Sequence, residues 1–361
     1  TMKLDYLKKL GVTCIYLTPI SNSYSNHRYD TGDYSEVDPM LGTEEDFKTL
    51  CKEAHKLGIH VINDGVYSHT GCDSKYFNRF GNYGDGGAYR DRNSPYFSWY
   101  KFNEWPNNYN SWWGFYTLPE VHEEDPNFNE YINGENGIVR KWMRDGNSGW
   151  RLDVADELPD VFLENLRKAV KAENPEGFVI GEVWEDASNK ESYGSRRKFI
   201  LGDQLDSVMN YVFRNAIIDF CKGVDAKYVM SNIMNVLENY PRPVIRVLMN
   251  LLSTHDTERI LTVIAGEPLN GRDRQWQAET KLTKEQREIG LQLVKIATGI
   301  QYTLPGFPCV YYGDEAGMEG YRDPFNRCGF PWGKEDKDLV EWYKDLGQMR
   351  GSISAFCDGE F

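Results

Sequence analysis

The chain has 361 residues, which is long enough for one large α/β barrel or for two domains of ordinary size. It carries 41 Lys and Arg against 55 Asp and Glu, and the net charge of −14 argues against nucleic acid or an anionic membrane as a partner. Its hydrophobic content of 40% is that of a globular protein, and no stretch is long and apolar enough to suggest a membrane span.

The seven cysteines are odd in number, scattered, and without the paired spacing of a metal site. Several lie in apolar runs, as buried free thiols do, which favours a reducing, cytoplasmic compartment. The chain has no signal peptide, but it begins abruptly in a helical pattern, TMKLDYLKKLG. Secretion after removal of an export signal therefore stays open, as does the oligomeric state.

Apolar runs of strand length alternate with helical patterns along the chain. The runs are residues 12–20, 59–67, 149–155, 177–184, 205–210, 244–256 and 307–315, and helical patterns such as 44–58 and 160–175 lie between them. This alternation predicts a parallel sheet. Because charged residues gather at the C-terminal ends of the runs, we expect a (β/α)8 TIM barrel rather than an open sheet. The chain begins on a helix, so the first strand is expected to precede residue 1.

Residues 70–128 interrupt the alternation and are rich in Gly, Asn, Asp, Tyr and Trp. The segment is too long for a plain loop, so we predict a small inserted subdomain on the barrel rim, with the barrel itself made by residues 1–69 and 129–361. Aromatic residues are frequent in residues 94–116. They suit the binding of sugar rings as well as ordinary core packing.

The segment GWRLDVADE, residues 149–157, places Arg151 and Asp153 two apart within an apolar run. On a strand both would project from one face, with Leu152 and Val154 packed behind them. A fixed cation beside Asp153 would keep that carboxylate ionised and aimed, as a nucleophile requires. Taken alone, such a pair is more often a structural salt bridge at a strand end.

Three further strand ends carry charged or titratable residues. The second run ends in Asp64 with His69 following, the fourth contains Glu182, and the sixth ends in His255 and Asp256. Taken singly, Asp64 and His69 could cap the loop that follows them, and Glu182 could pair with a lysine. His255 and Asp256 could cap the N-terminus of a helix that begins at TERIL. A barrel brings all these ends to one rim, where crowded carboxylates separate in pKa. One protonated and one ionised carboxyl group is the arrangement that glycoside hydrolysis needs.

These segments carry a family resemblance. DGVYSH (64–69), GWRLDVADE (149–157), GEVW (181–184) and STHD (253–256) resemble, in order, four signature segments of the α-amylase family of retaining glycoside hydrolases. HRYDTGDYSEVDPMLGT (27–43) and GFPCVYYGDEAGM (306–318) are also similar to that family. LPEVHEEDP followed by GWRLDVADELPD is most similar to the neopullulanase, cyclomaltodextrinase and maltogenic amylase group.

The resemblance implies a role for each matching residue. Asp153 would be the nucleophile, Glu182 the general acid and base, and Asp256 the carboxylate that grips sugar hydroxyls as the ring flattens. The substrate-binding residues would be Tyr29, Asp64, His69, Arg151, Glu157, Trp184, His255, Asp323 and Arg327. Within this set Arg151 would orient Asp153, His69 and His255 would bond hydroxyls of the sugar at the cleavage point, and Tyr29 would stack beneath it. Asp323 and Arg327 would bind the neighbouring sugar, and Trp184 and Glu157 would line the leaving-group side.

The chemistry so implied requires no metal or organic cofactor. Many relatives bind calcium at the inserted subdomain with an asparagine in the first signature segment, but this chain has Ser68 there, so we assign no calcium. The expected activity is hydrolysis of α-1,4-linked glucans and maltodextrins, with tolerance of α-1,6 links, pullulan or cyclodextrins. The alternatives are a transglycosylase, an exo-acting α-glucosidase, and an inactive glucan-binding protein on the same barrel. The sequence does not decide linkage preference, mode of attack or calcium dependence.

Overall fold

A computed structural model describes residues 1–359 of the chain. The chain forms two compact units. The first comprises Thr1–Lys8, Thr13–Val183 and Ala187–Asp206, and the second comprises Lys9–Val12, Trp184–Asp186 and the chain from Ser207 onward.

The first unit is built on parallel strands that pair in the order β1 (Cys14–Leu17), β4 (His60–Gly65), β7 (Gly149–Leu152) and β8 (Phe178–Gly181). Buried β-branched and aliphatic residues such as Val61, Leu152 and Val179 form the interior of this sheet. The register pairs Asp64 with Arg151 across β4 and β7. This register places two charged residues side by side where both strands end.

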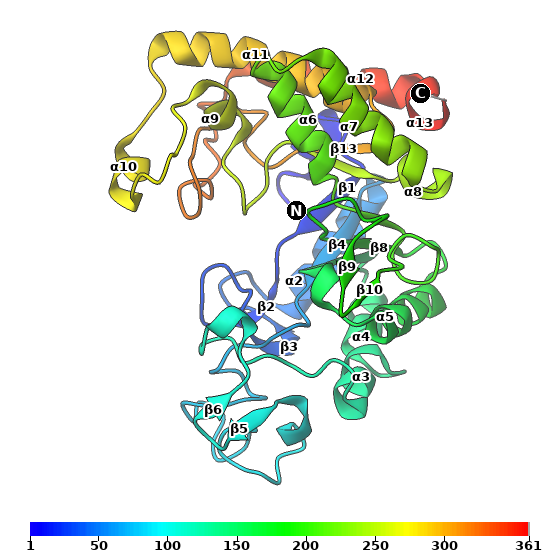
Figure 1. Ribbon diagram of the computed structural model, residues 1–361, viewed down its shortest axis with the longest axis vertical. Helices are drawn as coiled ribbons and strands as arrows, with labels where there is room; N and C mark the ends of the chain where they lie inside the picture. The colour runs from blue at the N-terminus through cyan, green and yellow to red at the C-terminus, as the bar shows by residue number, and fades with distance from the viewer. Residues whose placement is uncertain (360–361) are drawn as a thin grey trace. The chain divides into compact units, whose positions relative to one another are not determined.

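Helices connect these strands, as the parallel pairing requires. They are α2 (Glu44–Lys56), α3 (Pro126–Asn133), α4 (Ile138–Arg144) and α5 (Asp160–Glu173), while α1 (Leu4–Lys9) precedes the first strand. Helices α4 and α5 lie side by side (Figure 1). Helix α2 begins at a capping box in which Thr43 and Asp46 satisfy each other's backbone N–H groups. Helix α5 buries Phe162, Leu163 and Leu166 on one face.

The segment between β4 and α3 contains only short elements, namely η1 (Phe97–Trp99), β5 (Phe102–Glu104), β6 (Asn108–Tyr109) and η2 (Trp112–Gly114). Its interior is aromatic: Phe77 packs edge-on against Tyr100 and Tyr109, with ring centroids 4.9 and 4.7 Å away. The first unit also contains two hairpins, β2 (Ser21–Ser23) with β3 (Thr31–Val37) and β9 (Glu191–Ser192) with β10 (Ser195–Arg196). That residues 70–128 form a separate subdomain stays a prediction.

The second unit contains the parallel pair β12 (Met249–Leu251) and β13 (Phe307–Cys309), together with β11 (Ser207–Val208). Its helices are α6 (Tyr211–Cys221), α7 (Ala226–Asn239), α8 (Arg242–Arg246), α9 (Ile260–Ala265), α10 (Arg274–Glu279), α11 (Lys284–Thr303), α12 (Lys337–Ser352) and α13 (Ala355–Asp358). Helices α6 and α7 pack against each other, as do α11 and α12 (Figure 1).

Each of the seven apolar runs contains a strand, and the helices expected at 44–58 and 160–175 are α2 and α5. Two expectations were wrong in detail. The run 244–256 begins in helix α8 because Pro241 precedes it with an extended conformation, and only Met249–Leu251 is strand. The run 149–155 ends as a strand at Leu152, so Asp153 lies just beyond the strand.

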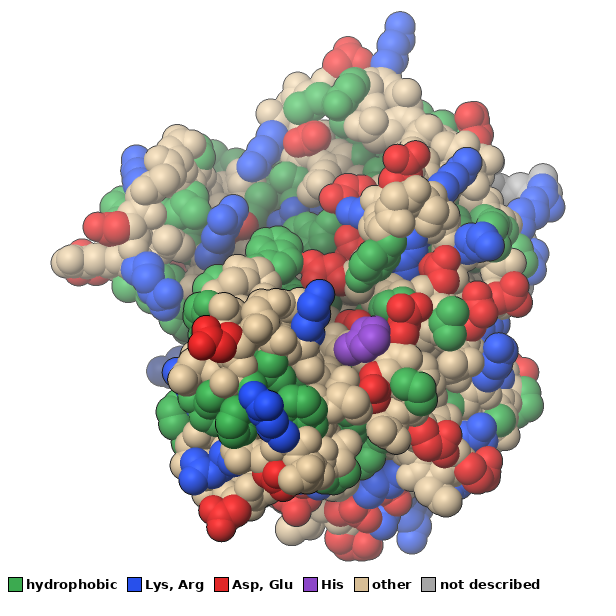
Figure 2. Space-filling view, turned by 60° about the horizontal axis from the view of Figure 1, so that its bottom comes forward, with side chains coloured by type: hydrophobic (Ala, Val, Ile, Leu, Met, Phe, Trp, Pro, Cys, Tyr) green, Lys and Arg blue, Asp and Glu red, His purple; other side chains and the backbone are tan. Residues whose placement is uncertain are grey.

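Among the described residues, no helix combines the length and hydropathy that crossing a membrane requires. On the face drawn in Figure 2, basic and acidic side chains are interspersed, and no broad basic area appears on that face. This distribution agrees with the acidic balance of the sequence.

Candidate active site

The side chain of Arg151 is the centre of a buried carboxylate cluster in the first unit. Its guanidinium lies 2.8 Å from Asp64 Oδ1, 2.8 Å from Asp153 Oδ1 and 2.9 Å from Glu182 Oε2, and the Arg151 side chain is fully buried. A buried cation requires such partners, because an unpaired one would cost several kcal/mol. Three carboxylates therefore share one positive charge, and this part of the site was predicted from the sequence.

Asp64 is held by two tyrosines as well as by Arg151. The hydroxyl groups of Tyr16 and Tyr29 both donate to Asp64 Oδ2, over 2.6 and 2.7 Å. Tyr29 was a predicted site residue, whereas Tyr16 was missed because it lies inside an apolar strand run. These bonds, together with the contact to Arg151, fix the carboxyl group of Asp64. Its contact with a sugar stays a prediction.

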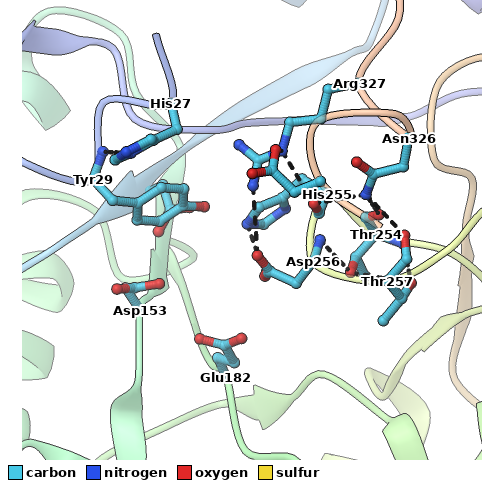
Figure 3. A network of polar contacts seen from close by, with 12 residues as sticks. His27, Tyr29, Asp153, Glu182, Thr254, His255, Asp256, Thr257, Asn326 and Arg327 are labelled. Atoms are coloured by element: carbon cyan, nitrogen blue, oxygen red, sulfur yellow. Dashed lines mark hydrogen bonds and ion pairs between the residues drawn. The ribbon is translucent and has the colours of Figure 1, made fainter. Parts of the chain in front are cut away.

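Asp153 follows the end of β7, and the next residue has an unusual backbone. Val154 has φ 39° and ψ 49°, the left-handed region that a β-branched residue rarely adopts. This turn directs the Val154 N–H to Glu182 Oε2, 2.9 Å away. Glu182 is thus fixed by one backbone amide and by Arg151. Figure 3 shows the carboxyl groups of Asp153 and Glu182, which come from the ends of neighbouring strands.

Burial raises the pKa of Asp153 well above its usual range, Arg151 lowers it, and the charges of Glu182 and Asp64 raise it again. If Asp64, Asp153 and Glu182 were all ionised, these three groups and Arg151 would together carry a net charge of about −2 in a buried site. Burial and the neighbouring carboxyl groups therefore disfavour the ionised form of Asp153, while Arg151 favours it. The expected division of labour, with Asp153 ionised and Glu182 carrying the proton, stays a prediction.

His69 is buried, and this burial lowers its pKa to about 4, so the ring is neutral near pH 7. Its Nε2 donates to the carbonyl oxygen of Tyr29 over 3.1 Å, and its Nδ1 accepts from the Ser68 hydroxyl at 2.9 Å. The predicted bond from His69 to a sugar hydroxyl would require one of these partners to be exchanged. In the structure His69 fixes the backbone of Tyr29, whose ring lies near that of His27 (Figure 3).

In the second unit the structure brings together four of the predicted residues. His255 Nε2 lies 3.0 Å from Asp256 Oδ2, and Arg327 Nη2 lies 3.6 Å from Asp256 Oδ1. Arg327 Nε also lies 2.8 Å from Asp323 Oδ1. Asp256 keeps about a third of its side chain exposed, at 35%, which leaves it accessible to a ligand.

Asn326 was missed by the sequence analysis, although it lies between the two residues singled out in DPFNR. Its buried Nδ2 donates to the carbonyl oxygens of His255 and Thr257, each over 2.8 Å, and to that of Thr254 over 3.3 Å (Figure 3). These bonds hold the loop that carries Asp256. A buried amide in a loop satisfies backbone groups that no secondary structure serves, and sequence alone does not reveal which loop it serves.

Glu157 and Trp184 have protein partners that the sequence did not reveal. Glu157 accepts one hydrogen bond from each of two neighbouring indoles, those of Trp112 and Trp113. In the second unit, the ring of Trp184 stacks on Tyr211 with centroids 3.9 Å apart, while the side chain remains partly exposed. The expected position of both residues beside the leaving group stays a prediction.

Calcium is not assigned at the first signature segment, and its absence there stays a prediction. The Ser68 hydroxyl, at the position where relatives often have asparagine, is bonded to His69. Across residues 1–359, no three Asp, Glu, His or Cys side chains are grouped as ligands for a metal ion.

The fold and the carboxylate cluster define the class of protein, a (β/α)8-barrel enzyme. The family described as alpha amylase, catalytic domain, matches residues 1–350. The chain therefore belongs to the α-amylase family, as the sequence motifs indicated.

Individual relatives agree with this assignment. The chain is similar to an amylopullulanase of Thermoanaerobacterium saccharolyticum, at 40% identity over 99% of the chain and 29% of that protein. It is also similar to neopullulanase 2 of Thermoactinomyces vulgaris, at 34% identity over 99% of the chain and 56% of that protein. Among solved structures, the debranching enzyme of Nostoc punctiforme matches with a TM-score of 0.84 and 33% identity, over 99% of the chain and 71% of its own. The chain thus spans well under two thirds of the two relatives matched by sequence.

Proposed function

We propose that the chain hydrolyses α-1,4-glucosidic bonds in starch-derived glucans and retains the anomeric configuration. The single observation that carries the proposal is the contact of one buried guanidinium, that of Arg151, with both Asp153 and Glu182. Two carboxyl groups fixed beside one bond of a sugar are the machinery of a retaining glycosidase.

The reaction would proceed in two displacements. Glu182, as the acid, gives a proton to the glycosidic oxygen while an Asp153 oxygen bonds to the anomeric carbon and the bond to the leaving sugar breaks. Water then attacks the resulting ester, Glu182 takes the proton from that water, and Asp153 leaves. The negative charge of Asp153 favours the positively charged transition state over the neutral substrate. Neither displacement needs a metal or an organic cofactor.

The substrate class follows from the relatives. Proteins similar to this chain are named amylopullulanase, neopullulanase 2 and cyclomaltodextrinase. We therefore propose pullulan and cyclodextrins as substrates beside starch, with α-1,6 links tolerated. The partner is a neutral glucan, whose binding the acidic net charge of the chain neither favours nor opposes.

The test is analysis of the products formed from starch, pullulan and a cyclodextrin. The Asp153→Asn variant serves as the inactive control. Release of α-anomeric maltodextrins, with panose from pullulan, is expected. Products of β configuration would contradict retention, and longer products made at the expense of hydrolysis would indicate a transglycosylase. Binding without any product would indicate an inactive glucan-binding protein.

A further inference from the structure

Two adjacent tryptophans in the segment between β4 and α3 share a single carboxylate. Trp112 Nε1 donates to Glu157 Oε2 over 2.7 Å, and Trp113 Nε1 donates to Glu157 Oε1 over 2.8 Å. Both oxygens of Glu157 are thereby used to fix indole rings. The rings stack on each other with centroids 5.2 Å apart and planes 22° from parallel.

The outer ring of this pair is held open to solvent. Trp113 is 75% exposed, and its backbone has φ 49°, in the left-handed region that residues other than glycine rarely adopt. Exposing a large apolar ring and straining its backbone both cost free energy. A strained residue held by its surroundings points to a function for its side chain.

The residue that anchors the rings is itself held firmly. The backbone carbonyl of Glu157 accepts from the Tyr193 hydroxyl, on the turn between β9 and β10. The carbonyls on either side, of Asp156 and Leu158, accept from Arg197 over 2.8 and 2.5 Å. Three consecutive carbonyls are therefore fixed, so Glu157 can hold the indoles without rearranging when a ligand arrives.

The tryptophan pair is close to the candidate catalytic residues of the same unit. The ring of Trp112 lies against His69, with centroids 5.0 Å apart. Glu157 follows Asp153 by four residues, through the turn that begins at Val154. A glucan bound at the carboxylate cluster would therefore have the exposed indole beside a neighbouring ring.

We propose that Trp113, supported by Trp112 and aligned by Glu157, is a stacking platform for one glucosyl ring next to the sugar that is cleaved. A pyranose ring offers an apolar face of C–H groups, and a fixed indole binds such a face at low entropic cost. In this assignment Glu157 is a positioning residue and does not contact sugar. The proposal rests on the proposed function for the identity of its ligand.

The test compares Trp113→Ala with the wild-type chain on two substrates. Maltoheptaose reaches beyond the cleaved sugar, whereas α-glucosyl fluoride occupies that position alone. Loss of one stacking contact should raise the KM for maltoheptaose about tenfold, with a smaller change in kcat, and should leave the constants for the fluoride near the wild-type values. Phe80→Ala is the matched control, because Phe80 is an exposed aromatic residue of the same segment, at 64% exposure. This control should behave as the wild type.

Glu157 is tested through its coupling to Trp113. Glu157→Ala should raise the KM for maltoheptaose as much as Trp113→Ala does, and the double variant should be no worse than either single variant. Glu157→Gln keeps one acceptor oxygen for one indole, so it should give an intermediate KM. Additive losses would show that Glu157 acts independently of the indole and would overturn its positioning role.

Three results would overturn the platform itself: an unchanged KM for Trp113→Ala, an equal loss on both substrates, or an altered sedimentation coefficient without a change in KM. The last would assign the exposed ring to contact with a second copy of the chain. Calorimetric titration of maltoheptaose in an Asp153→Asn background separates this proposal from the proposed function. Binding that weakens on loss of Trp113 supports the platform even if the wild-type chain shows no turnover, and absence of binding overturns both.

Discussion

Arg151 Nη1 donates to Asp153 Oδ1 over 2.8 Å, from a side chain that is wholly buried. The same guanidinium contacts Asp64 and Glu182, so it links Asp64, which two tyrosines hold, to both candidate catalytic carboxyl groups. The geometry and the charge state of the pair therefore depend on one residue.

Arg151→Met should lower the free energy of unfolding by about 3–5 kcal/mol, because it leaves buried carboxylates without their counter-charge. Denaturant unfolding measures this loss. Arg144→Met is the matched control: Arg144 forms surface ion pairs with Glu173 and Glu135, and such exposed pairs contribute little to stability. Equal losses in the two variants would contradict the central role of Arg151.

Glu182→Gln should reduce kcat/KM on maltodextrins by about 10²–10⁴-fold, since the leaving oxygen then receives no proton. The loss should be much smaller on maltosyl fluoride, whose leaving group needs little protonation. Steady-state rates on the two substrates provide the comparison, with the exposed Glu176→Gln as control. Similar losses on both substrates would show that Glu182 is not the acid.

The raised pKa of Asp153 predicts where activity falls in acid. A nucleophile must be ionised, so kcat/KM should decline as pH falls through a pKa that burial, Glu182 and Asp64 have raised above that of an ordinary aspartate. Asp64→Asn removes one of the charges that raise this pKa and leaves Arg151 with one carboxylate partner fewer. On maltosyl fluoride, the acid limb of that variant should therefore move to lower pH. A shift in the opposite direction would mean that the limb reports another group.

Asn326→Ala should destabilise the loop that carries Asp256. It leaves buried backbone carbonyls without donors, at a cost of about 1–3 kcal/mol, and should raise the KM for maltodextrins. Thermal unfolding and steady-state kinetics measure the two effects. The control is Asn239→Ala, at an exposed position near the end of α7. An unchanged KM would show that Asn326 does not support substrate binding by the loop that carries Asp256.

Chelation tests the absence of a metal from the proposed mechanism. Treatment with EDTA should leave the initial rate on maltodextrins unchanged, because proton transfer and attack are both assigned to side chains. A rate that falls on chelation and returns on addition of calcium, with circular dichroism constant throughout, would contradict that assignment.

The sequence predicted the strands and the carboxylates well because both leave local signals. Strand β7, for example, lies in the apolar run 149–155, and the charged residues of that run are Arg151 and Asp153. The left-handed turn at Val154 was not predictable, since valine ordinarily disfavours it. Nor were the contacts of Tyr16 with Asp64 or of Asn326 with its loop, because these join residues distant in sequence.

Glu157 is a further residue whose contacts could not be predicted from the sequence. Its acidity and its place after the nucleophile suggested a residue that lines the substrate site. Only the structure shows that both its oxygens are bonded to indoles 44 and 45 residues away along the chain.

The most direct test of the central claim is to trap the covalent intermediate. A fluorinated maltosyl fluoride that forms the glycosyl ester quickly and hydrolyses slowly should add one maltosyl unit to the chain, and peptide mass spectrometry should locate it on Asp153. The Asp153→Asn variant should remain unlabelled. A label on any other residue, or turnover by the Asp153→Asn variant at the wild-type rate, would contradict the account.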